Sequence, residues 1–113
     1  MEMAARTDAE QKELVRIWDA QEKELVSFRG DIGDYLNDEV LEIKREQYLS
    51  EGKWVTSKYI LVTGTGGPHV EFDTNHLISV FWAGGVQEYS TNDKKAMATI
   101  DSIADFLDEI YPE

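Results

Sequence analysis

The chain has 113 residues, 42% of them hydrophobic, and no cysteine. One domain over residues 1–113 with a sizeable core is therefore expected, while disulfides, thiolate zinc sites and thiol nucleophiles are excluded. Twenty-three acidic residues outnumber eleven basic ones, and the net charge of −12 argues against direct binding to nucleic acid or to an anionic membrane. No apolar run approaches the roughly 20 residues of a bilayer span. The N-terminus lacks a secretory signal pattern, so a cytoplasmic protein is expected.

The first predicted element is a helix over about residues 8–29. Thr7 and Glu10 have the spacing of a capping box. Apolar residues then follow in steps of three, four and seven, which is typical of one buried helix face. Gly30 is a natural stop, and residues 31–38 are predicted to form a connection. The apolar stripe consists of Leu14, Ile17, Trp18, Leu25 and Phe28.

The middle of the chain has the alternation and turn residues of a β-meander. A strand is predicted over residues 40–49, although a helix over 38–49 remains an alternative. Ser50-Glu51-Gly52-Lys53 is typical of a hairpin turn. The later strands are rich in β-branched and aromatic residues and are separated by glycine-containing turns. They are expected at 54–63, 69–73, 77–83 and 86–90, with breaks at 64–68, 73–76 and Gly84-Gly85.

A final helix is predicted from about residue 93 to Tyr111, capped by Thr91 or Asn92, with Asp93 in its first turn. The expected fold class is therefore α+β, with an antiparallel meander of four to five strands flanked by an N-terminal and a C-terminal helix.

The strand over 77–83 is apolar on both of its faces, whereas a sheet with one wet face should alternate. Either the helices lie on opposite faces of the sheet, or the second face is an interface. A structural homodimer therefore stands as one alternative for the role of the chain. The apolar residues are Ile78, Val80 and Trp82 on one parity and Leu77, Phe81 and Ala83 on the other.

Two histidines and two carboxylates gather around the third predicted strand: His69, Glu71, Asp73 and His76. They resemble a carboxylate–imidazole metal cluster, although a polar outer strand face explains the pattern more simply. Together with the glycine-rich loop over 64–68, they define a second alternative, a small-ligand or metal-binding domain. The loop lacks the Lys-Ser/Thr pair of phosphate-binding loops, and no cofactor or metal is predicted.

Acidic residues recur at helical spacing along the final helix, opposite its apolar stripe. A solvated face is the simplest explanation, and a docking surface for Lys and Arg is the functional one. A second acidic group precedes and begins the first strand. The residues predicted to contact a partner are Asp101, Asp105, Asp108 and Glu109, then Asp38, Glu39 and Glu42.

No spacing of Ser, His and Asp forms a convincing catalytic set, so no enzymatic activity is expected. The preferred hypothesis is a small acidic protein that binds a basic protein partner. Its concrete version is an inhibitor or adaptor of a nucleic-acid-handling protein, of the DNA-mimic or anti-defence type. Trp54 follows a turn, and an exposed Trp beside an acidic surface would suit such an interface.

Overall fold

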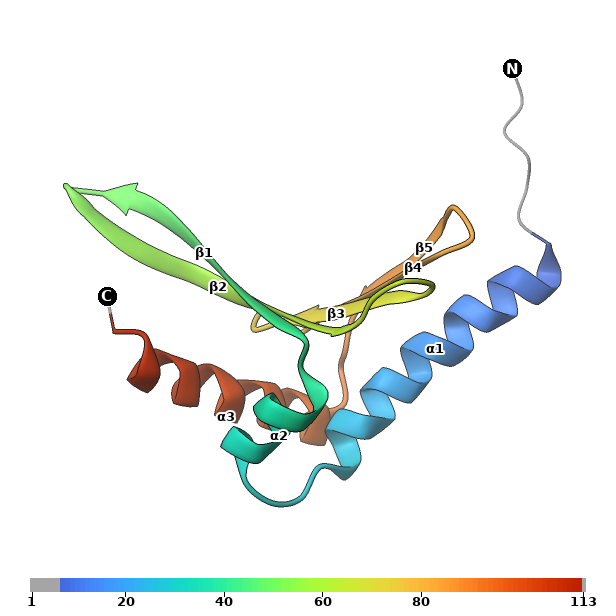
Figure 1. Cartoon of the computed structure of the whole chain (residues 1–113), viewed down its shortest axis with the longest axis horizontal. Coiled ribbons are helices and arrows are strands. Elements are labelled where there is room, and N and C mark those ends of the chain that lie inside the picture. Colours follow the sequence, from blue (N-terminus) through green and yellow to red (C-terminus); the bar gives the residue numbers. More distant parts are fainter. Residues whose placement is uncertain (1–6, 113) are drawn as a thin grey trace.

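A computed structural model describes residues 7–112 and has the predicted α+β organisation (Figure 1). Two helices precede the strands and one follows them. The elements are α1 (Asp8–Ser27), α2 (Ile32–Glu39), β1 (Glu42–Ser50), β2 (Lys53–Gly64), β3 (His69–Asp73), β4 (Leu77–Trp82), β5 (Gly85–Ser90) and α3 (Lys94–Ile110).

The five strands form one antiparallel sheet in the order β1-β2-β3-β4-β5, which confirms the predicted meander. Residues 42–50 are a strand, so the helical alternative for 38–49 is wrong. The sheet is bent, and all three helices lie along its convex side (Figure 1). The expectation that the helices might cover opposite faces is therefore wrong, and the concave face of the sheet carries no helix in the described chain.

The core lies between the sheet and helices α1 and α3. Phe72 and Ile78 from the strands meet Leu25, Ile100 and Ile103 from the helices, and each of these side chains is almost completely buried. A smaller cluster of Leu14, Val70 and Val80 continues the core toward the start of α1. Trp18 bridges the two clusters, and its indole Nε1 donates a hydrogen bond to the Ile78 carbonyl at 2.9 Å.

Helix ends follow the capping chemistry of the sequence. The Thr7 hydroxyl accepts from the Glu10 backbone N–H at 3.1 Å, and the Glu10 carboxylate accepts from the Thr7 N–H, which confirms the capping box. The N-cap of α3 is Asp93, so the assignment to Thr91 or Asn92 is wrong. Thr91 is instead buried and donates its hydroxyl proton to Glu22 on α1 at 2.6 Å.

Two further predictions need correction. Residues 31–38 are not a connection, because α2 forms there with Asp31 as its N-cap. The turn between β4 and β5 lies one residue earlier than Gly84-Gly85, since Trp82 pairs with Gly85. Ala83 and Gly84 take the two positions with positive φ, of 51° and 74°, which is the backbone of a tight hairpin.

The hairpin of β1 and β2 extends beyond the rest of the sheet (Figure 1). We call residues 46–58 the β arm. The chain has a radius of gyration of 15.6 Å, whereas a compact domain of this length has about 13 Å. The molecule is thus a helix-covered body with one projecting ribbon. None of the helices in residues 7–112 has the length and apolar content needed to cross a membrane.

Candidate partner-binding site

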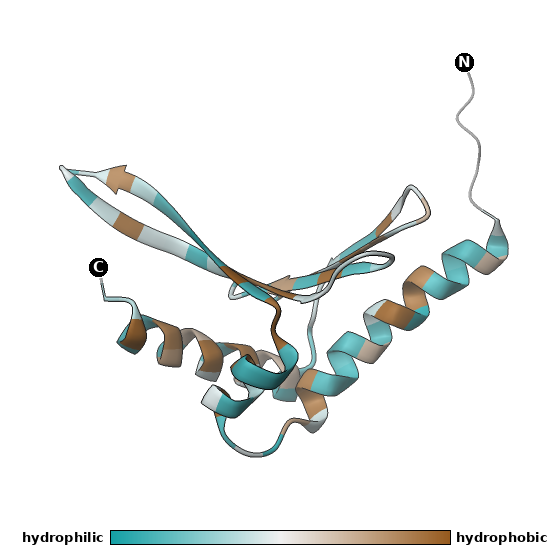
Figure 2. Ribbon diagram, viewed as in Figure 1, coloured by the Kyte–Doolittle hydropathy of each residue, from teal (hydrophilic) through white to brown (hydrophobic). Residues whose placement is uncertain are grey.

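An acidic concave surface lies between the end of α1 and helix α2. It is an open pocket of about 570 Å³. Only Arg29 contributes a positive charge to its lining, and this guanidinium donates to the Phe28 carbonyl at 2.7 Å. Figure 2 shows α2 as a mostly hydrophilic helix. The carboxylates of the pocket are Glu24, Asp31, Asp34, Asp38 and Glu39. Two of them, Asp38 and Glu39, belong to the predicted partner-binding set.

The floor of this acidic pocket is aromatic. Phe28 and Tyr35 meet edge to face, with ring centroids 5.3 Å apart. An aliphatic stem can lie on such rings while a cationic head reaches the carboxylates around them. The chemistry of the pocket therefore suits a lysine or arginine side chain better than a bare anion or a purely apolar group.

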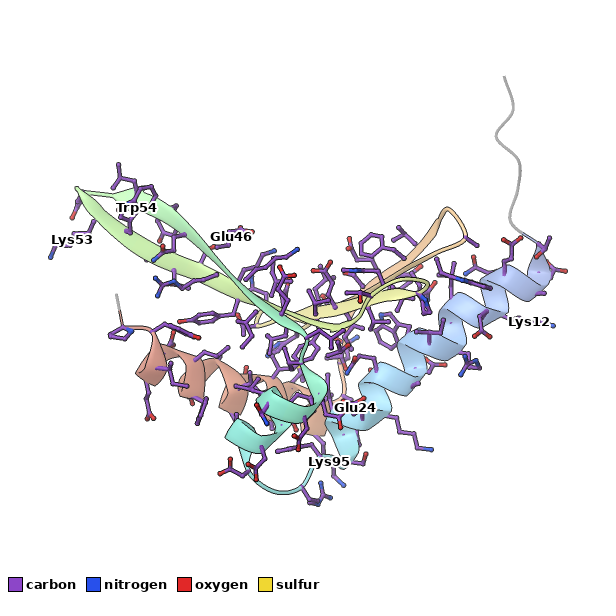
Figure 3. All side chains as sticks on the ribbon, viewed as in Figure 1. Lys12, Glu24, Glu46, Lys53, Trp54 and Lys95 are labelled. Carbon is purple, nitrogen blue, oxygen red and sulfur yellow. The ribbon has the colours of Figure 1, made fainter. Side chains whose placement is uncertain are left out.

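Three buried polar atoms lie close together beside the pocket: Gln21 Nε2, Glu24 Oε1 and the Tyr35 hydroxyl. None makes a hydrogen bond of good geometry in the described chain, although Tyr35 interacts with both Glu24 and Gln21. Tyr35 is only 6% exposed, and Glu24 projects between α1 and α2 (Figure 3). Unsatisfied polar groups of this kind are costly and scarce in folded proteins. Of the three, the Glu24 carboxylate lines the pocket and can accept a hydrogen bond from an incoming cation, whereas Gln21 Nε2 can only donate.

Burial raises the pKa of the Glu24 carboxyl; the nearby Tyr35 hydroxyl lowers it, and the charge of Glu39 raises it again. Burial also raises the pKa of the Tyr35 hydroxyl, and the negative charge of Glu24 adds to the effect. Burial is the main cause of both shifts, and neighbouring negative charge adds to them. A cation entering the pocket would therefore favour the charged form of Glu24.

The position of Asp38 and Glu39 along α2 is electrostatically unfavourable. They lie at its C-terminal end, where the helix dipole is negative, and the last turn of this fully described helix carries no base. Each such contact costs about 0.3–1 kcal/mol at low ionic strength. These carboxylates therefore do not stabilise the helix that carries them.

Two of the four acidic residues predicted on α3 contact side chains of β2 and of the β3–β4 turn. Asp101 accepts from His76 Nε2 at 2.7 Å, and Asp108 accepts from the Tyr59 hydroxyl at 3.1 Å. Burial, followed by the Asp108 carboxylate, raises the pKa of Tyr59. Asp105 and Glu109 are exposed. Two carboxylates of this ridge thus already serve contacts inside the fold.

The acidic groups on α2 and α3 do not form one continuous row. The α3 ridge faces the side of His76 and Tyr59, whereas α3 presents Phe106 to α2, where Gly33 lies against its ring. Phe106 is about 100° further round the helix than Asp105. Glu42 is separate again, because it lies on β1 with Lys44 Nζ at 3.9 Å.

The histidines and carboxylates of the predicted metal cluster are divided between two places. His69 Nε2 lies 3.1 Å from Glu71 Oε1, next to the loop over 64–68. His76 lies past the other end of β3 and faces Asp101. No group of three His, Asp or Glu within residues 7–112 is arranged to hold a metal ion.

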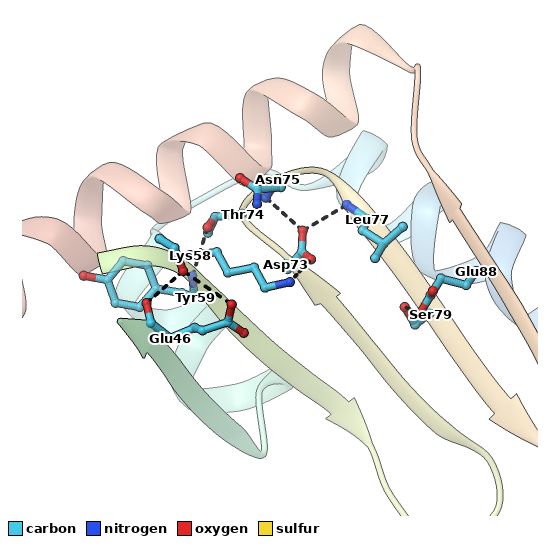
Figure 4. A network of polar contacts seen from close by, with 10 residues as sticks. Glu46, Lys58, Tyr59, Asp73, Thr74, Asn75, Leu77, Ser79 and Glu88 are labelled. Carbon is cyan, nitrogen blue, oxygen red and sulfur yellow. Dashed lines mark hydrogen bonds and ion pairs between the residues drawn. The ribbon is translucent and has the colours of Figure 1, made fainter. Parts of the chain in front are cut away.

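Asp73, the remaining member of that cluster, has a structural role. It is buried and accepts from the backbone N–H groups of Asn75 and Leu77 at 2.8 and 3.1 Å (Figure 4). Its second oxygen lies 3.4 Å from Lys58 Nζ. The carboxylate therefore ties the β3–β4 turn to β2.

No protein-family model matches this chain, and neither a curated protein nor a solved structure is significantly similar to it. Function is therefore inferred from the geometry and charge of the chain's own residues.

Proposed function

We propose that this protein binds a basic protein partner without catalysing a reaction, and that the acidic pocket between α1 and α2 receives a lysine or arginine side chain of that partner. The observation that carries the proposal is the combination of five carboxylates, one of them the half-buried Glu24, with an aromatic floor. Charge alone would not distinguish this surface from the α3 ridge.

The chemistry of recognition follows from the pocket. The aliphatic stem of the partner side chain packs on Phe28 and Tyr35, and its cationic head donates to the Glu24 carboxylate. Rim carboxylates such as Asp34, Asp38 and Glu39 accelerate the encounter through long-range attraction. Because the acidic groups form no continuous row, docking of individual basic side chains fits better than mimicry of a phosphate backbone.

An inhibitor or adaptor that acts on a nucleic-acid-handling protein remains the concrete version of this proposal, since such proteins present basic surfaces. The cytoplasmic location also remains a proposal. The small-ligand or metal alternative receives no specific support from the divided histidines.

The test is calorimetric titration with a defined probe, a peptide of nine arginines, at low and at physiological salt. Replacing Asp34 and Asp38 by Asn and Glu39 by Gln is expected to weaken binding at least tenfold, because it removes three charges from the pocket. A peptide of nine glutamates is the negative control.

The matched variant carries Asp101→Asn, Asp105→Asn and Asp108→Asn, which changes the net charge by the same amount. We expect it to lose less than threefold in affinity. Equal losses in the two variants would show that only overall charge matters and would refute the pocket as the site.

A further inference from the structure

The β arm differs from the body in what supports it. Residues 60–62 of β2 pair with β3 on one side and β1 on the other, but the part of β2 before Ile60 has only β1 as a neighbouring strand in the described sheet. An isolated ribbon of two strands is marginally stable in water. The arm therefore receives less support from the sheet than the body does.

Apolar side chains are exposed along this arm. Tyr48, Leu49 and Trp54 keep 53%, 61% and 60% of their surface accessible. Trp54 and Lys53 lie at the tip, away from the helices (Figure 3). Large aromatic and aliphatic side chains grouped on one projection are typical of a protein interface.

The outer edge of β1 is long and regular. Nine residues, Glu42–Ser50, pair with β2 on one side and with no described strand on the other. The irregularity in the β1–β2 register falls on β2, where Ser57 is an extra residue that pairs with no residue of β1. The bulge therefore belongs to β2, and β1 itself has none. Native edges are usually blunted by charged side chains, prolines, bulges or short length. The first half of β1 carries charges, but residues 47–50 have no charge and β1 has neither a proline nor a bulge.

The charge distribution of the chain indicates which partner covers the outer edge of β1. The β arm contains two acids, Glu46 and Glu51, and two bases, Lys53 and Lys58, so its net charge is zero. The whole −12 of the chain rests on the other residues. Two copies that meet at their arms avoid bringing their acidic surfaces together, whereas contacts through the helices would oppose like charges.

We propose that two copies of this chain associate through antiparallel pairing of their β1 strands, across a two-fold axis near Gln47, and form a continuous ten-stranded sheet. The backbone of each edge supplies the hydrogen bonds, and Tyr48 and Leu49 of both copies become buried. This association is independent of the proposed binding of a basic partner.

Cross-strand charges select the register. An axis at Arg45 or at Glu46 places two identical charges directly opposite each other, which is destabilising. An axis at Gln47 sets Glu46 opposite Tyr48 and Arg45 opposite Leu49 of the second copy. It has the longest overlap, residues 44–50 of each strand, without opposed like charges.

Sedimentation equilibrium of the full chain over a range of concentrations tests the proposal. We expect a monomer–dimer equilibrium that Tyr48→Lys with Leu49→Lys weakens at least tenfold, because charge is placed on the paired edge. Both side chains are more than half exposed, so the variant should keep its fold, which circular dichroism checks.

The matched control is Val86→Lys with Tyr89→Lys on β5, the other edge, where these side chains are 45% and 61% exposed. It should change the dimer constant less than twofold. A monomer at every concentration, or a dimer weakened only by the β5 variant, would overturn the proposal. Dimerisation should also strengthen with salt, whereas binding of a basic partner should weaken, so failure of one proposal is distinguishable from failure of the other.

A single introduced cysteine tests the register, because the chain has no native thiol. Gln47→Cys should be cross-linked to a dimer by a short bismaleimide, while Val86→Cys should stay monomeric on the gel. Efficient cross-linking through Val86→Cys, or none through Gln47→Cys, would contradict an axis near Gln47.

Discussion

The helix-covered body and the β arm place the same residue types in different environments. Trp18 in the body packs against both core clusters and donates to the Ile78 carbonyl, whereas Trp54 on the arm keeps 60% of its surface exposed. The body also holds the whole net charge, and the arm is neutral. The comparison teaches that the buried core and the exposed apolar side chains of the arm lie in separate parts of this small chain, while the acidic surface belongs to the body.

The largest expected effect is a loss of folding stability from a substitution in the core of the body. Phe72 is 1% exposed at the centre of the core, so Phe72→Ala should lower the free energy of unfolding by about 3–5 kcal/mol. Urea unfolding followed by circular dichroism measures it. The matched change on the arm, Trp54→Ala, should alter stability of the monomer by no more than about 0.5 kcal/mol. A comparable loss in both variants would show that the arm is part of the cooperative core.

A smaller effect concerns Glu24. Because its pKa is raised in the fold, the native state holds its proton more tightly than the unfolded chain does, so stability falls as pH rises through this raised pKa. Glu24→Gln should therefore stabilise the protein at neutral pH by up to about 1 kcal/mol. It should also flatten this part of the pH dependence.

Urea unfolding at a series of pH values checks this second prediction, with Asp19→Asn on the exposed side of α1 as the control. A loss of stability in Glu24→Gln at neutral pH, with the pH slope unchanged, would contradict the electrostatic crowding assigned to the pocket.

Most of the fold was predictable because its signals are local. The Thr7 capping box, the apolar stripe of α1 and the turn at Glu51-Gly52 depend on residues close in sequence. Helix α2 was missed because it is short, yet the spacing of Asp31 and Asp34, where the Asp31 carboxylate accepts from the Asp34 N–H at 3.0 Å, was a capping signal.

The candidate site was only partly predictable. Asp38 and Glu39 were selected for their charge, but Glu24 and Tyr35 come to the pocket through the packing of α1 against α2, which no spacing in the sequence encodes. His69 and His76 are close in sequence, but they lie at opposite ends of β3, so the length of the extended strand separates them.

The most direct test of the central claim is a ¹⁵N NMR titration with the nine-arginine peptide, since it reports where on the molecule a basic partner binds. The account predicts amide shifts concentrated between Glu24 and Glu39, with smaller changes along α3 and none on the β arm. Shifts centred on Asp101–Glu109, or spread evenly over all acidic residues, would contradict the assignment of the pocket.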